Sequence, residues 1–216
     1  MVLYLIYLAC LLFSAIIAFV YREALKSRQL SILIPYLFLV FIQEVCVFLC
    51  RRYIEGFSTN LIYNLYRPVS TFCFAWLFYH IPFNVSIRKM ILWMQVLYLA
   101  LTAVVYLFIT PIRQYNSFLS LVAGMIITIY ALFLLFNYFN LDNITEEKKW
   151  KPLTWICAGL VTFYPVVNIF FAFSRYIHAK QIAIMGTMLY NAVPQLLSIF
   201  MYGCFAYAFY LCKKKN

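Results

Sequence analysis

Residues 116–139 read NSFLSLVAGMIITIYALFLLFNYF and contain no Asp, Glu, Lys or Arg. A helix needs about 20 mostly apolar residues to cross a bilayer, so this stretch predicts a membrane-spanning helix. In hydrocarbon the backbone must satisfy its hydrogen bonds within the segment, which favours a helix for a continuous apolar run. A membrane β-barrel would instead show short segments of alternating hydrophobicity, and this sequence does not.

Six further stretches have the same apolar character. The seven expected spans cover residues 2–20, 30–50, 61–83, 90–109, 116–139, 153–174 and 183–211. The links between them are short, so we expect residues 1–216 to form a single all-α transmembrane domain. Apolar types make up 67% of the 216 residues and charged types 11%, against about 45–50% and 25% in soluble domains. This composition excludes a soluble enzyme, a disordered chain and a secreted disulfide scaffold.

The net charge of +11 reports orientation rather than nucleic-acid binding, because the basic residues lie between apolar runs. The first, third and fifth links and the tail contain eleven Lys and Arg, the other links five, and Arg67 lies inside a span. The positive-inside rule therefore predicts an outside N-terminus and a cytoplasmic C-terminus. The first span lacks a preceding basic region, so we expect it to be retained. The cytoplasmic Lys213–Lys215 run is either an interfacial anchor or, in a eukaryote, a retrieval signal.

The sequence contains little catalytic chemistry. Among six acidic residues, only Glu44 falls inside a span, and the two histidines are His80 and His178. Acid–base and metal catalysis need cooperating groups, and no H-E-x-x-H or G-x-S-x-G motif is present. We therefore expect neither enzymatic activity, nor a metal site, nor a cofactor. The seven cysteines lie in spans or at their ends, which indicates packing rather than a disulfide.

Glu44 and Arg67 are the charged residues expected inside the bundle. Each lies six residues from the outer end of its span, at a depth of about 9 Å. A charge inside a membrane is costly, so it usually faces the bundle interior and has a partner. Because their spans are joined by a short link, we expect an ion pair between Glu44 and Arg67. The pair would either lock the two spans together or belong to a functional site.

Other polar residues are expected at a similar depth. These candidates are Gln43, Tyr63, Asn64, Asn168, Tyr190, Asn191 and Gln195. Tyr63 and Asn64 share a side of their helix with Arg67, because residues three and four apart are neighbours. Together with Glu44 and Arg67 these groups form either an outward-opening polar pocket with tyrosines in its wall or a set of interhelical hydrogen bonds.

A run in the sixth span resembles a known pattern. Lys151-Pro-Leu-Thr-Trp-Ile-Cys-Ala-Gly-Leu160, followed by Tyr164 and Asn168, is similar to the sixth-helix signature of small uncharacterised bacterial membrane proteins. That group also has an acidic residue in helix 2, a tyrosine near the start of helix 3 and an asparagine in the last helix, which Glu44, Tyr66 and Asn191 match. Ser70 stands where the group often has a glutamate. The resemblance implies a bacterial inner membrane and no particular activity.

The missing catalytic chemistry leads to a non-enzymatic function. We expect a membrane-embedded sensing or accessory protein that modulates a partner protein at the cytoplasmic face. The alternative is a transporter or facilitator for a small solute, with the polar site in the outer half of the bundle. Expected partners are the lipid bilayer, a cytoplasmic protein and, as an open alternative, a second copy of the chain, but no nucleic acid.

Overall fold

The computed structural model describes residues 2–54, 58–81, 85–139, 144–173, 183–184 and 187–213, and leaves out the side chains of residues 144–149, 183–184, 187–188 and 190–191. These ranges are almost wholly helical. The elements are α1 (Val2–Val20), α2 (Arg22–Ser27), α3 (Leu33–Tyr53), α4 (Asn60–His80), α5 (Val85–Val104), the π-helical η1 (Val105–Ile109), α6 (Ser117–Phe139), α7 (Ile144–Ala172), β1 (Ala183–Ile184), β2 (Thr187–Met188) and α9 (Leu189–Lys213).

Six helices in the described part of the chain are long and apolar enough to cross a membrane. They are α1, α3, α5 with η1, α6, α7 from Trp150 and α9 from Ala192. Large apolar side chains point outward along them; Phe13, Trp93 and Phe136 are 61%, 64% and 68% exposed. Soluble proteins rarely expose such a surface. The chain is therefore an integral membrane protein built as a helical bundle.

Helix α4 corresponds to the expected third span and, at 21 residues, is as long as α3. It is absent from the set of six because it contains Asn64, Arg67, Ser70 and Thr71 on one side. Polar residues on a helix that faces other helices lower its hydropathy without exposing charge to lipid. The seventh membrane crossing therefore stays a prediction.

Several element bounds differ from the sequence prediction. The last helix begins at Leu189 rather than 183, because Ala183–Ile184 pairs antiparallel with Thr187–Met188. Thr187 is β-branched, and this residue type favours strands over helices. Helix α7 begins at Ile144, nine residues before the expected 153.

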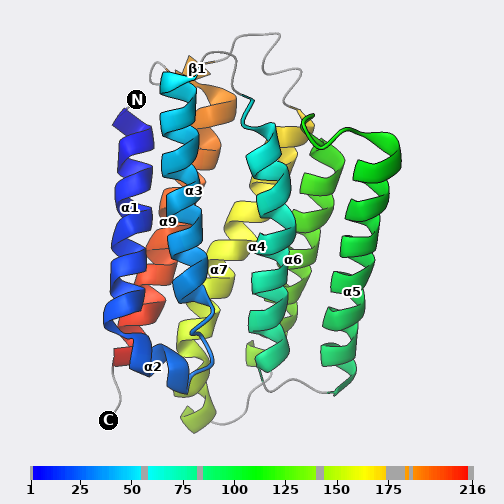
Figure 1. The fold of residues 1–216 in the computed structure, drawn as a ribbon. Coiled ribbons are helices and arrows are strands. Elements are labelled where there is room, and N and C mark those ends of the chain that lie inside the picture. Colours follow the sequence, from blue (N-terminus) through cyan, green and yellow to red (C-terminus); the bar gives the residue numbers. More distant parts are fainter. Residues whose placement is uncertain are drawn as a thin grey trace.

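The helices form a ring in chain order. Around it, α1 packs on α3, α3 on α4, α4 on α6, α6 on α7, α7 on α9 and α9 on α1. Helix α5 lies outside this ring, against α4 and α6, at one edge of the bundle (Figure 1). Helix α1 begins at one end of the bundle and α9 finishes at the other, which we call the N-terminal and C-terminal ends (Figure 1).

The C-terminal half of the ring is densely packed. Phe74, Phe78, Phe205, Phe209 and Leu33 in this half have no exposed surface. A Cβ added at Gly159 of α7 would lie 3.2 Å from the Cys204 Cβ and 3.3 Å from the Met201 Cα of α9. Small residues let membrane helices approach closely, and lipid offers no hydrophobic drive between helices, so such packing stabilises the bundle.

Truncating Phe205 to alanine is expected to lower the free energy of unfolding by about 3 kcal/mol, because it leaves a cavity between packed helices. Phe200→Ala on the same helix is the matched control. Phe200 is 49% exposed and faces outward, so its truncation is expected to change stability by about 0.5 kcal/mol or less. Reversible unfolding in bicelles measures both values, and equal losses would contradict the assignment of this interior.

Candidate functional site

A cavity of about 850 Å³ occupies the N-terminal half of the ring. Helices α1, α3, α4, α6, α7 and α9 all contribute to its wall. The charged lining residues are Glu44, Arg51, Arg52 and Arg67. The lining tyrosines are Tyr4, Tyr7, Tyr36, Tyr63, Tyr66, Tyr115, Tyr164 and Tyr202. The structure thus brings five of the predicted site residues to one cavity: Glu44, Tyr63, Arg67, Asn168 and Gln195.

Glu44 lies in the wall formed by α3 and is 8% exposed. The Tyr4 hydroxyl of α1 donates to its Oε2 at 3.1 Å and to its backbone oxygen at 3.0 Å. The Tyr63 hydroxyl of α4 donates to its Oε1 at 3.4 Å. Two phenols therefore connect the carboxylate of α3 to the helices on either side.

Arg67 lies in the wall formed by α4 and reaches toward α6. Its Nη1 donates to Asn64 Oδ1 and to the backbone oxygen of Asn116, each at 3.0 Å. The guanidinium carbon is 4.4 Å from the centre of the Tyr115 ring, a cation–π geometry. These contacts hold the planar guanidinium at the α4–α6 side of the cavity.

The predicted ion pair between Glu44 and Arg67 is wrong. Among the residues that the structure describes, the ion pair within 4 Å is Arg22–Glu23 on the surface, at 3.5 Å. Glu44 and Arg67 both line the cavity, but Tyr63 donates to Glu44 from α4, while Arg67 donates to the chain before α6. The carboxylate and the guanidinium therefore belong to different sides of the same cavity.

Asn64 is a structural residue rather than part of the cavity wall. It is 1% exposed, and its Nδ2 donates to the backbone oxygens of Ile112 and Gln114, both at 2.7 Å. Together with its contact to Arg67, it fixes α4 to the segment between η1 and α6. Of the two alternatives predicted for the polar residues, Asn64 therefore fits the structural hydrogen bond rather than the pocket wall.

Gln43 is also absent from the cavity wall. It is buried in α3, and neither atom of its amide has a hydrogen-bond partner among the described residues. A buried amide without partners destabilises a fold, and the structure gives no compensating contact for it. The side chains of Tyr190 and Asn191, the remaining candidates, lie outside the described residues.

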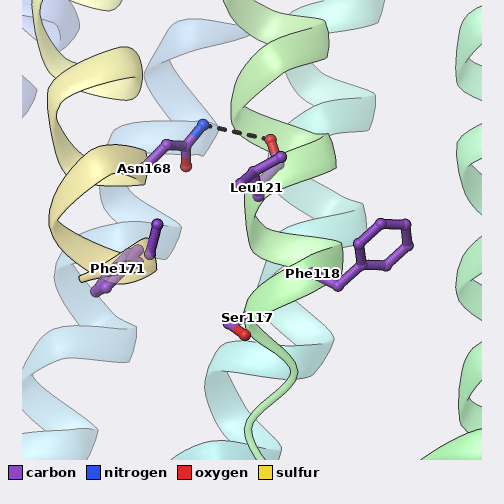
Figure 2. A pocket seen from close by; sticks show the side chains of 6 residues that line it. Ser117, Phe118, Leu121, Asn168 and Phe171 are labelled. Atoms are coloured by element: carbon purple, nitrogen blue, oxygen red, sulfur yellow. Dashed lines mark hydrogen bonds between the residues drawn. The ribbon is translucent and has the colours of Figure 1, made fainter. Parts of the chain in front are cut away.

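Asn168 of α7 lines both the large cavity and a smaller one of about 110 Å³. Figure 2 shows this smaller cavity between α6 and α7, with Asn168 facing Leu121 and with Phe171 and Ser117 nearby. The Asn168 Nδ2 donates to the backbone oxygen of Leu121 at 3.3 Å. This close approach requires Gly124, since a Cβ there would lie 2.5 Å from Nδ2.

Sequence reasoning missed most of the aromatic wall and two of its arginines. The ring centroids of Tyr4 and Tyr7 of α1 are 5.7 Å apart, and those of Tyr7 and Tyr202 of α9 are 6.1 Å apart. On the other side, the hydroxyls of Tyr36 and Tyr66 are 2.7 Å apart. Arg51 was assigned to a link, although it follows Glu44 by two helical turns and so shares its side of α3. The spacing between Glu44 and Arg51 was therefore a sequence signal for this arginine. The tyrosines of α1 have no comparable signal in the sequence.

Comparison of the chain with protein-family models, with curated proteins and with solved structures finds no match. The resemblance to small bacterial membrane proteins therefore stays a prediction.

Substituting Gly124 by alanine is expected to cost about 1–3 kcal/mol of stability, because the added methyl group overlaps the Asn168 amide. In an Asn168→Ala background the same change is expected to be neutral or stabilising by up to about 1 kcal/mol, since alanine favours helices over glycine. Unfolding free energies of the four variants in bicelles test this. Additive effects would show that the two positions do not interact.

Proposed function

We propose that the protein is a membrane receptor that binds a small molecule in the cavity and modulates a partner protein. The observation that supports binding is the cavity of about 850 Å³ with charged, polar and aromatic walls. Small-molecule sites typically measure about 300–1,000 Å³ and combine apolar walls with a few placed polar groups. Structural hydrogen bonding alone would not require so large a space.

The packing of the C-terminal half favours sensing over transport. Below the cavity the ring is filled by side chains with no exposed surface, such as Phe74, Phe78 and Phe205. A ligand that enters from the N-terminal end therefore meets a closed floor. A ligand bound in such a site would shift the surrounding helices, but it would have no open path across the bundle.

Helix α9 connects the cavity with the opposite end of the bundle. Pro194, Gln195, Ser198, Met201 and Tyr202 form its part of the cavity wall. The same helix ends at Lys213, whose Nζ lies 5.7 Å from the centre of the Tyr21 ring before α2. A shift of α9 on ligand binding would thus reach the basic side chains of α2 and Lys213, where a partner protein would bind.

Transport of a small solute is the second candidate. Pro68, Pro165 and Pro194 lie inside α4, α7 and α9, which all line the cavity. Proline interrupts the helical hydrogen bonds, and broken helices around a polar site near the membrane centre are common in transporters. Alternating access would require the packed half to open.

The orientation belongs to the same proposal. The first, third and fifth links predicted from the sequence and the tail contain eleven basic residues, which supports a cytoplasmic C-terminal end. The cavity would then face the outside, and the bacterial inner membrane is the proposed location.

Ser198→Cys is expected to react with a membrane-impermeant methanethiosulfonate applied to intact cells. Ser198 lines the cavity, so water brings the reagent to it from the outside. The background has the seven native cysteines replaced, and Leu196→Cys, at a position 49% exposed on the outer face of α9, is the lipid-facing control. Reaction only in inverted vesicles would reverse the orientation.

Filling the cavity is expected to abolish ligand retention. Ser198→Trp places an indole in the cavity, whereas Leu196→Trp places one on the outer face of the same helix. Native mass spectrometry of protein extracted into nanodiscs should show a small-molecule adduct for the wild type and Leu196→Trp, and none for Ser198→Trp. An unliganded wild type, or the same adduct in all three proteins, would contradict the proposal.

A further inference from the structure

Glu44 and Arg67 line the same cavity without forming an ion pair with each other. One cavity contains a carboxylate toward α1 and a guanidinium toward α6, and neither neutralises the other. We propose that the ligand is a zwitterion of the α-amino acid type, which places its ammonium group at Glu44 and its carboxylate at Arg67. This inference rests on the proposed binding function and names the class of ligand for the same cavity.

The carboxylate pole provides what an ammonium group requires. Glu44 is 8% exposed, and its oxygens accept hydrogen bonds from the Tyr4 and Tyr63 hydroxyls. No cationic side chain of the described residues lies within 4 Å of it, and Arg51 of the same helix acts on it only from a greater distance. Phenols donate hydrogen bonds but provide no positive charge, and a buried carboxylate is stabilised chiefly by a charged partner. A ligand ammonium provides that charge.

The aromatic rings beside Glu44 favour a cation over a neutral donor. The Tyr4 ring is stacked on Phe48 with centroids 5.8 Å apart, and it also contacts Tyr7 at 5.7 Å. Tyr4, Tyr7 and Phe48 all line the cavity. Ring faces attract ammonium groups through their quadrupoles, and proteins use clusters of aromatic rings with a carboxylate for this purpose.

The guanidinium pole is oriented for an anion. Arginine has five N–H donors in a fixed plane, and both hydrogen bonds to Asn64 and Asn116 use the same nitrogen, Nη1. The Tyr115 ring holds the plane from one side, and the Tyr106 hydroxyl is a further hydrogen-bond partner of the group. The remaining edge can take a carboxylate, whose two oxygens match the arginine fork.

The mouth of the cavity contains further positive charge. Arg51 and Arg52 line it about two turns beyond Glu44 on α3, and Arg51 Nη2 donates to the Thr59 hydroxyl at 2.9 Å. Charges of one sign at a cleft entrance increase the local concentration of opposite charges. The two arginines would draw in the carboxylate end of the ligand, while Glu44 is the deeper group that selects its ammonium end. The many tyrosines of the cavity wall favour a ligand whose own side chain is aromatic or apolar.

Three probes with the same phenyl ring test the charge pattern. L-Phenylalanine has both charges, 2-phenylethylamine only the ammonium and 3-phenylpropionate only the carboxylate. Calorimetric titration of the protein in nanodiscs, with subtraction of empty nanodiscs, measures each affinity. L-Phenylalanine is expected to bind at least about tenfold more tightly than either analogue, because it alone pairs with both charged groups.

Two substitutions that remove one charge each assign the poles. Glu44→Gln is expected to weaken L-phenylalanine and 2-phenylethylamine about tenfold and to leave 3-phenylpropionate unchanged. Arg67→Gln is expected to weaken L-phenylalanine and 3-phenylpropionate and to leave 2-phenylethylamine unchanged. Because Arg67 also holds Asn116, Arg67→Lys is a second variant that keeps the charge but loses the fork. Arg113→Gln, at an exposed position outside the cavity wall, is the control, and thermal unfolding checks the fold of each variant.

The outcomes separate the two proposals. Equal binding of L-phenylalanine and 3-phenylpropionate, with no effect of Glu44→Gln, would make the cavity an anion site and overturn the zwitterion. If no probe binds, while the native adduct still depends on Ser198, the zwitterion is overturned and the binding function stands. Absence of both the probe signals and the adduct would overturn the binding function itself.

Discussion

A polypeptide backbone inside hydrocarbon has no water with which to form hydrogen bonds, and every other feature of this protein depends on that constraint. It makes each long apolar segment a helix and leaves side chains as the only means of joining one helix to the next. Lipid is as apolar as leucine, so burial of apolar surface does not drive helices together. Close packing and polar contacts have to do so.

The bundle uses these two means in different halves. Toward the C-terminal end, large aromatic side chains fill the ring, and Gly159 brings α7 close to α9. Toward the N-terminal end, hydroxyl, amide and charged groups connect helices around a cavity instead of filling it. Tyr4, Glu44 and Tyr63 connect α1, α3 and α4, while Asn64 and Arg67 connect α4 to the segment before α6. Close packing thus fills one half of the ring, and hydrogen bonds between helices surround the cavity in the other half.

The division also explains why the polar residues do not neutralise each other. A cavity wall made of six helices presents each polar group from its own direction, and the nearest donor for Glu44 is a phenol rather than a guanidinium. Phenols satisfy the lone pairs of the carboxylate without cancelling its charge. A site that keeps opposite charges apart in a low dielectric is preorganised for a partner that has both, which is the physical basis of the proposed ligand class.

The sequence by itself determined the helical membrane architecture, because the length and hydropathy of each run depend only on local composition. It placed α1 at its observed bounds, 2–20, and it assigned Glu44 and Arg67 comparable depths from their positions along the spans. The helical period identified which side of a helix is polar, but not which neighbour that side meets. Only the order of helices around the ring decided that Arg67 faces Asn116 and Tyr115, that Glu44 faces Tyr4, and that tyrosines of α1, α3, α4 and α9 share one cavity. Depth follows from counting along one helix, whereas direction around the axis follows from long-range packing between helices.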